Sequence, residues 1–521
     1  MFGFKATLCI VILTISLGKA QTRKDSTKVA DSSGVFEDVK KFSEKDNWIS
    51  KLVRNVLVID ENDSLAAERT TSTEKNYKRF KGKFIRDVRI RVLDVFGPSI
   101  SKPDAQAVSW LQITGNAIHV NTREWTVRQK LLFSPGERIN PLAVAETERL
   151  LRRSSNIYDA KISVRNVKNA KDSVDIDVLV QDVWSISVSL SYQPENKAAG
   201  ISMTDVNFLG LGNEFSHALR FDDDFPNGWT WSGSYTISNI ADTYISGKLY
   251  TLTDRTSRHY GFGINREFIS PLFLWAGGAT FDWGKDRLLL PDGNLSGQEV
   301  HYKLQDYWLG YTPDGELYVA GRLIHTQYTE RMVVDSLRVF QNNNLYLGSV
   351  GFARRAYFRD NYVFGLGKPE DIPVGALVSL TGGVEDGEFV NRPYYGFMAG
   401  VSKYTDDFAY LYGGLRMGGF RNGGDWKNAV IAFESLYFTK LMNIGTFPWR
   451  NFLALRVAYS YDPPTGGSVL TINDGNGIRG FDASSFGNKK IVVNYESNLF
   501  VPASFIGFRM GFLVFADFGV I

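Results

Sequence analysis

The sequence predicts a mainly β protein: a transmembrane antiparallel β-barrel of about sixteen strands or slightly more, preceded by a small α+β domain. Three observations support this prediction. The chain begins with a secretory-type segment, residues 81–184 alternate between strand and helix patterns, and strand-like segments follow one another from Trp184 onward without a convincing helix. About seventeen such segments can be counted up to Ile521.

Residues 1–20 are typical of a signal peptide. Lys5 supplies the positive start, a short apolar run follows, and Gly18 and Ala20 provide small residues for cleavage before Gln21. A short buried helix is the alternative, which the terminal position disfavours. No later segment has about 18 consecutive apolar residues, so no transmembrane helix is expected. The only cysteine is Cys9, and its loss with the signal would exclude disulfides, thiolate metal sites and cysteine nucleophiles.

The composition fits a membrane barrel. Aromatic residues make up 14% of the chain and 49 residues are glycine, a mixture that suits aromatic girdles and crowded strand positions. The formal net charge is only +3, which gives no reason to expect a nucleic-acid partner.

Residues 21–80 are expected to be a polar linker that contains one amphipathic helix at 36–58. A connecting helix is the favoured interpretation, and contact with a membrane surface is the alternative. The same helix is a candidate plug for a secretion pore.

Residues 81–184 predict the order β-α-α-β-β. The expected elements are strands near 88–92, 160–164 and 174–180 and helices at 126–133 and 140–153. Asn140 is a suitable N-cap and Pro141 suits the first helical position. The apolar residues of this second helix do not form one clean stripe, so its prediction rests on capping and propensity.

Residues 185–521 show the two-residue alternation of barrel strands. In one segment Trp229 and Trp231 alternate with Thr230 and Ser232, and the segments near 453–460 and 491–496 behave alike. We expect the apolar set to face lipid and the other set to face the lumen. A soluble sandwich would give the same alternation, but segment length, aromatic content and the exported start favour the membrane.

Four stretches carry a family resemblance. Residues 82–184 look like one POTRA domain. The second stretch is GISMTDVNFLGLGNEF (200–215), which contains an early-strand turn at Asn207, Phe208, Gly210 and Gly212. The other two are GNGIRGF (475–481) and FADFG (515–519). In order and spacing the chain resembles the BamA/TamA superfamily of outer-membrane assembly and translocation barrels, the bacterial surface antigen family. It departs from the family in its single POTRA domain and in having about seventeen strands where sixteen are usual.

The resemblance implies a place in the outer membrane with the N-terminal domain in the periplasm. It implies that the protein inserts outer-membrane proteins or moves a client polypeptide. The client would add a strand to the POTRA edge and then meet a weakly paired barrel seam. Periplasmic accessory proteins and the lipid bilayer are the other implied partners. A two-partner secretion pore for one dedicated substrate and a passive channel remain the alternatives.

The same resemblance singles out a luminal motif, Ile478, Arg479, Gly480 and Phe481, and a wall motif, Phe515, Asp517 and Gly519. It implies that the loop enters the lumen, where the Arg479 guanidinium meets the Asp517 carboxylate. A solvated loop arginine is the alternative. Arg509 falls on the same strand face by period two and could compete for that carboxylate.

Other motifs do not support an enzyme, a metal site or a cofactor. Gly475, Gly477 and Gly480 fit G-x-G-x-x-G, but no βαβ unit surrounds them. Asp222, Asp223 and Asp224 lack calcium-loop spacing, so a solvated turn is favoured. The five histidines are scattered and no G-x-S-x-G elbow is present.

The last expectation concerns the C-terminus. In the family, the FADFG motif lies on a strand that about three more strands follow, and this chain ends at Ile521. A barrel cannot leave a backbone edge facing lipid. We therefore expect the chain to be incomplete by on the order of 50–80 residues, at about ten residues per strand plus turns.

Overall fold

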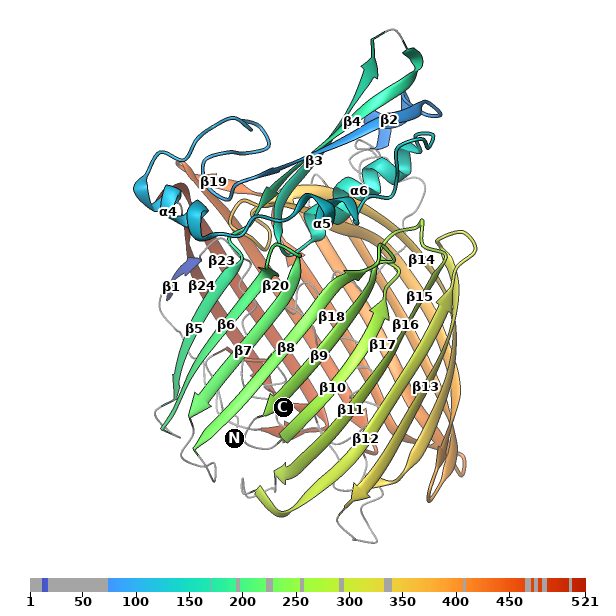
Figure 1. The fold of residues 1–521 in the computed structure, drawn as a ribbon. Coiled ribbons are helices and arrows are strands. Elements are labelled where there is room, and N and C mark those ends of the chain that lie inside the picture. The colour runs from blue at the N-terminus through green and yellow to red at the C-terminus, as the bar shows by residue number, and fades with distance from the viewer. Residues whose placement is uncertain are drawn as a thin grey trace.

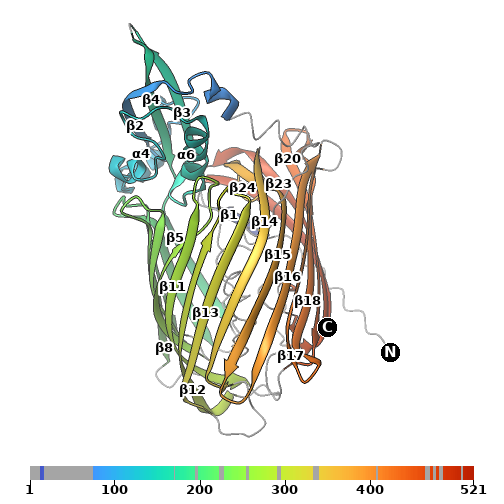
Figure 2. The same ribbon diagram turned by 90° about the vertical axis from the view of Figure 1, so that its right-hand side faces the viewer.

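A computed structural model shows a large barrel with a small domain against one of its two mouths (Figures 1 and 2). The residues that the structure describes are 12–16, 74–168, 170–193, 197–221, 228–253, 257–289, 295–331, 340–405, 409–463, 470–472, 477–479, 485–505 and 508–521. The expected helix at 36–58 lies outside them, as do Asp222, Asp223 and Asp224.

The named elements of the small domain are one three-stranded sheet and the helices α4 to α6, and residues 74–78 are also helical. The named elements are β2 (Phe84–Leu93), α4 (Trp110–Ile118), α5 (Glu124–Arg128), α6 (Pro141–Arg153), β3 (Ile157–Val167) and β4 (Ala170–Asp182). β4 lies in the middle, parallel to β2 and antiparallel to β3. Inward residues of all three strands form one core with α6, as their two-residue alternation requires.

The helices differ in part from the expectation. α6 begins after Asn140, whose side chain accepts a hydrogen bond from the backbone of Leu142, and Pro141 is its first residue. The short helix is α5, at Glu124–Arg128 rather than 126–133. α4 was not expected, although Ser109 and Gln112 form a capping box at its start, which is a recognisable helix signal.

The barrel wall is one sheet of long strands. They are β5 (Ile186–Gln193), β6 (Ala198–Phe208), β7 (Asn213–Phe221), β8 (Trp229–Ile240), β9 (Ile245–Thr253), β10 (Ser257–Arg266), β11 (Trp275–Leu289), β12 (Leu295–Tyr311), β13 (Leu317–Glu330), β14 (Asn343–Asn361), β15 (Pro369–Gly387), β16 (Asn391–Thr405), β17 (Ala409–Asn422), β18 (Asp425–Phe438), β20 (Phe447–Tyr461), β23 (Lys489–Phe505) and β24 (Phe508–Val520). The three-residue β19 (Met442–Ile444) also pairs with β20. The expected fold class, an antiparallel barrel behind one small α+β domain, is confirmed.

The alternation of the strands separates an apolar outer face from a mixed inner face. Trp229, Trp231, Leu453 and Ile491 are exposed large apolar side chains, whereas the neighbouring Ala454 is buried. An exposed apolar belt around a barrel is the surface that lipid covers. No helix among the described residues combines the length and apolarity needed to cross a membrane.

β5 and β24 stand at the two ends of the series of antiparallel pairings. The strand order places them beside each other, but no residue-by-residue register joins them among the described residues. β24 pairs with β23 on one edge, and its residues 509–513 also pair with β1 (Ile12–Ser16), inside the expected signal segment. Whether more strands follow Ile521 stays a prediction.

Candidate functional site

Arg479 lies on the inner face of the barrel wall and contacts two strands. Its Nε donates to Asp517 Oδ2 at 2.9 Å, and its Nη2 donates to Asp517 Oδ1 at 2.8 Å. Its backbone N–H also donates to Asp517 Oδ2, at 2.8 Å. A second ion pair joins it to Glu496 of β23. This fork-to-fork geometry fixes the loop before β23 in one position against β23 and β24.

The other residues of FADFG make room for the same loop. The guanidinium of Arg479 lies 4.1 Å from the ring centroid of Phe515. At Gly519, a Cβ would come within 2.7 Å of Ile478 Cδ1. Phe515, Asp517 and Gly519 therefore share one face of β24. Phe515 contributes an aromatic ring, Asp517 contributes a carboxylate, and Gly519 has no side chain and so leaves room for Ile478. Gly480 and Phe481 lie outside the described residues.

Arg509 does not compete for Asp517, so that expectation was wrong. Its guanidinium donates to the carbonyl of Leu366 at 2.8 Å and lies 5.4 Å from the ring centroid of Tyr158 in the small domain. The two-residue alternation of a strand correctly placed Arg509 on the same face of β24 as Asp517. The two side chains do not meet because eight residues of extended strand separate them. It lies at the mouth that the small domain covers, whereas the luminal loop is fixed farther along the strand.

The early-strand turn between β6 and β7 fastens the barrel to the small domain. The Asn207 side chain accepts from the N–H of Gly212 at 2.9 Å and donates to Val120 O at 3.0 Å. Gly210 O accepts from the N–H of Arg123 at 3.0 Å. Phe208 stacks on Phe215 within the barrel, with centroids 4.8 Å apart.

Backbone conformation and close packing explain why Gly210 and Gly212 are glycines. Both have positive φ, +74° at Gly210 and +63° at Gly212. A Cβ on Gly210 would lie 2.5 Å from the carbonyl oxygen of Asn121. The turn can thus bend and approach the domain backbone only without side chains at these positions.

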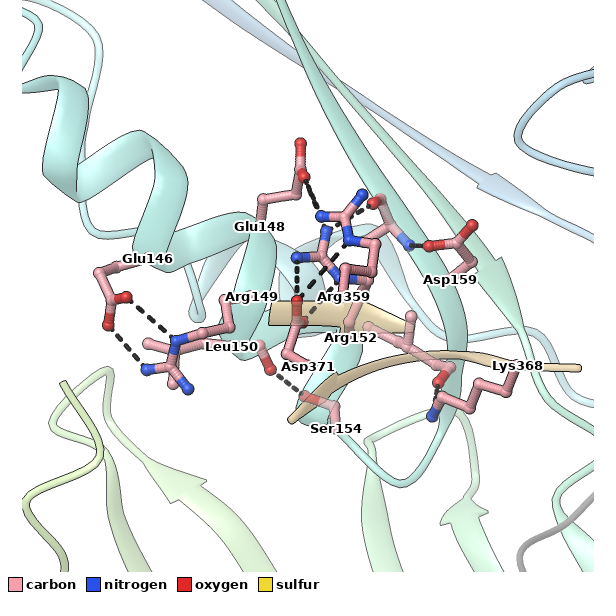
Figure 3. Close-up of polar contacts among 12 residues, drawn as sticks. Glu146, Glu148, Arg149, Leu150, Arg152, Ser154, Asp159, Arg359, Lys368 and Asp371 are labelled. Atoms are coloured by element: carbon pink, nitrogen blue, oxygen red, sulfur yellow. Dashed lines mark hydrogen bonds and ion pairs between the residues drawn. The ribbon is translucent and has the colours of Figure 1, made fainter. Parts of the chain in front are cut away.

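A network of buried charges joins α6 to the barrel (Figure 3). Arg152 donates to Asp371 of β15 through Nε at 2.9 Å and through Nη2 at 3.1 Å. Its Nη1 also donates to Glu148 of the same helix at 2.7 Å. Arg359 of β14 reaches Glu148 from the other side at 2.9 Å. The side chains of Arg152 and Glu148 are 3% and 6% exposed, so α6 and the barrel wall together remove this pair from water, whereas Arg359 stays partly exposed.

Further contacts extend this junction along the helix. Arg149 pairs with Glu146, donates to the carbonyl of Ile269, and lies 4.2 Å from the ring centroid of Tyr357. In the loop before β15, Lys368 donates to Ile157 O at 2.8 Å. The helix predicted by capping is therefore a second element, besides the β6–β7 turn, that attaches the domain to the barrel.

The electrostatics of the junction favour ionised groups. Burial alone would raise the pKa of the Glu148 carboxyl, but Arg152, the N–H of Ile162 and Arg359 stabilise the carboxylate more, and its pKa lies below its ordinary value. Burial likewise opposes the charge of Arg152, yet Asp371 and Glu148 raise its pKa. A buried side chain stays ionised when an oppositely charged group is paired with it in this way.

Sequence reasoning missed this junction, although one signal was present. The apolar positions of α6 do not form a clean stripe because Glu148, Arg149 and Arg152 occupy buried positions. A helix with charges on its inward face needs a charged partner, so the irregular stripe could have suggested one. The partners Arg359 and Asp371 lie more than 200 residues away and carry no local signal.

The scattered histidines are also placed by the fold. His259 lies between two carboxylates on neighbouring strand β11, Nδ1 being 3.1 Å from Asp282 and Nε2 3.1 Å from Asp286. Across the described part of the chain, no three His, Cys, Asp or Glu side chains gather as metal ligands would. The described elements that follow the G-x-G-x-x-G stretch are the strands β22 (Phe486–Gly487) and β23, whereas a dinucleotide site requires a helix there.

No family model matches the chain, and no curated protein matches its sequence. Among solved structures it is similar to BamA from Haemophilus ducreyi lacking POTRA domains 1–3, with 11% identity and a TM-score of 0.33, over 83% of this chain and 85% of that chain. It is also similar to CdiB from Acinetobacter baumannii, with 10% identity and a TM-score of 0.34, over 94% and 100%. For CdiB from Escherichia coli the values are 9% and 0.35, over 84% and 77%.

Because these TM-scores lie below 0.5, the fold assignment rests on this chain's own strand pairings. Those pairings, the domain order and the placement of Arg479 beside Asp517 are independent of any comparison. The chain is an antiparallel β-barrel with one small α+β domain attached to its mouth, the architecture implied by the resemblance of its motifs to the BamA/TamA superfamily.

Proposed function

We propose that this protein resides in a bacterial outer membrane, with its small domain in the periplasm, and inserts or translocates client polypeptides. The observation that carries the proposal is an unpaired stretch of sheet edge in the domain, held beside the barrel mouth. An exposed edge can accept an extended client as an additional strand.

The two edges of the domain sheet differ in whether a client could use them. On β3, the Tyr77 hydroxyl donates to Ile162 O at 2.9 Å, and Ile162 N–H donates to Glu148 at 2.9 Å. Arg152 also donates to Ala160 O. Side chains of the domain thus already occupy the inner half of the β3 edge, so a client could add only near the hairpin tip.

The β2 edge is open along its second half. Ile85 pairs with the segment at 136–137, and Arg128 donates to Val88 O at 3.3 Å. Beyond that point, among the described residues, no hydrogen bond other than the pairing with β4 reaches the backbone of Ile90 or Val92. A hollow of about 430 Å³ lies beside this stretch, and its lining includes Arg91–Asp94, Ala105–Ala107, Ile113 and Asn116.

Photocrosslinking tests which edge binds a client. A photoreactive residue at Arg91, in the open half of β2, should trap a secreted or outer-membrane polypeptide in cells. The matched control is Lys161, an exposed basic residue in the blocked half of β3. Equal trapping at both positions, or at neither, would contradict binding at the β2 edge.

The identity of the trapped protein separates the alternatives. Many different outer-membrane proteins would support a general assembly role, whereas one large exported protein would indicate a two-partner secretion pore. Conductance in planar bilayers without any trapped client would favour a passive channel. The location is tested separately: a closed barrel should fractionate with the outer membrane and migrate faster unboiled than boiled. Recovery as a soluble periplasmic protein would contradict it.

A further inference from the structure

α4 turns its apolar stripe away from the domain. Gly115 is buried, packed so closely that a Cβ would meet Phe96 at 2.8 Å and Trp184 at 3.7 Å. On the opposite side, positions 110, 113, 114, 117 and 118 follow helical spacing, and all are exposed. Trp110 is 71% exposed and Ile118 is 62% exposed. An amphipathic helix normally buries such a stripe, so this surface requires a cover outside the domain.

The exposed stripe is joined by further exposed apolar residues, with Arg123 and Glu124 the exposed charged residues next to Trp125. We call this patch the α4 surface; its large apolar residues are Val108, Trp110, Ile113, Ile118, Val120, Trp125 and Leu209, all exposed. Leu209 comes from the barrel, in the β6–β7 turn. The hydrogen bonds from Asn207 to Val120 O and from the N–H of Arg123 to Gly210 O hold the two parts together.

The α4 surface lies at the same rim of the barrel as exposed apolar side chains of the wall. α4 lies at the outer rim of the barrel, beside the ends of β5 and β6 in Figure 1 and on the β5 side of the mouth in Figure 2. β5 itself carries Val188 and Leu190 as exposed apolar side chains, the latter 80% exposed. Exposed apolar side chains are therefore present on the wall strand β5, in the β6–β7 turn at Leu209 and on α4.

We propose that α4 lies in the interface of the membrane leaflet on the domain side and anchors the domain to phospholipid. Tryptophan prefers the membrane–water interface because its ring is apolar and its N–H is polar. The stripe has no charged side chain, and the exposed Arg123 beside it can reach headgroup phosphates while its stem stays on the apolar side. A helix of this kind lies in the plane of the interface. The inference rests on the proposed membrane location of the barrel.

The position of α4 can be measured in the full chain refolded into vesicles of phosphatidylethanolamine and phosphatidylglycerol. With Cys9 replaced by Ser, a single cysteine is introduced by Ala117→Cys and labelled with bimane. Ala117 is exposed on the stripe and Gly115 is not altered. The control is Lys171→Cys, an exposed position in the β3–β4 hairpin, whose tip points away from the barrel (Figure 1). Lipids brominated near the headgroup should quench the label at position 117 several-fold more than the label at 171.

Three results would overturn the inference in distinguishable ways. Equal, weak quenching at both positions in a heat-modifiable barrel would place α4 in water and refute the membrane anchor alone. Protection of position 117 from aqueous thiol reagents in cells, combined with no quenching in vesicles, would show that a protein covers the surface. Failure of the folded chain to enter vesicles as a heat-modifiable barrel would refute the proposed location and the anchor together.

Discussion

Replacing Arg152 by Met removes the charge at the centre of the α6 junction while keeping an apolar stem of similar length. The change deletes both hydrogen bonds to Asp371, the bond to Glu148 and the bond to Ala160 O. Arg359 remains near both carboxylates, at 2.9 Å from Glu148 and 3.7 Å from Asp371. Breaking a buried ion pair from one side costs about 3–5 kcal/mol, and the remaining arginine places the expected loss near the lower value.

Arg153→Met is the matched control on the next residue of the helix. Arg153 pairs with Glu267 at 3.1 Å, but the two side chains are 35% and 48% exposed. An exposed pair contributes about 0–1 kcal/mol. The two variants therefore make the same chemical change in a buried and in an exposed position.

Hydrogen exchange of α6 amides in the full chain measures the free energy of opening the junction. A loss of about 3 kcal/mol corresponds to roughly a hundredfold faster exchange through opening. Asp371→Asn should have a smaller effect after Arg152→Met than alone, because the partner is already absent. Equal exchange in Arg152→Met and Arg153→Met, or additive effects of Arg152→Met and Asp371→Asn, would refute the idea that this ion pair holds the domain.

Three further outcomes follow from the geometry. Arg479→Ala and Asp517→Asn should each abolish function in a complementation assay and reduce stability by a few kcal/mol at most; wild-type behaviour of both would contradict a role for the luminal pair. Gly210→Ala should loosen the domain by roughly 1–3 kcal/mol, since it adds strain at positive φ and a close approach to the domain backbone. Gly423→Ala adds the same kind of strain at φ +59° in the β17–β18 hairpin but meets no neighbouring atom, so it should leave hydrogen exchange of the domain unchanged. Burial lowers the pKa of Lys130 to about 8 from 10.5, although Asp182 opposes the shift. Between these pH values the unfolded chain binds more protons, so the free energy of unfolding should rise with pH, by up to about 3 kcal/mol. Lys130→Met should remove this rise in urea titrations followed by pulse proteolysis, and an unchanged pH slope would contradict the burial argument.

The sequence by itself determined the class of the fold. Two-residue alternation is a local property, so Trp229, Trp231, Leu453 and Ile491 could be assigned to an outer face without knowledge of their neighbours. Capping is equally local, and Asn140 with Pro141 placed the start of α6 correctly. Arg479 and Asp517 came from a family resemblance, and the fold brings them together.

Only the tertiary structure decided which groups cover each face of a helix or strand. A pattern shows that one side of a helix is apolar or charged, but the partner comes from elsewhere in the chain. Arg152 meets Asp371 across 219 residues, and Arg509 is held by Leu366 rather than Asp517 because distance along the strand separates groups that period two treats alike. The stripe of α4 obeys the same spacing as a core helix, and only packing against Phe96 and Trp184 through Gly115 shows that it faces outward. Local spacing fixes which residues share a face, whereas burial depends on long-range contacts that no local window contains.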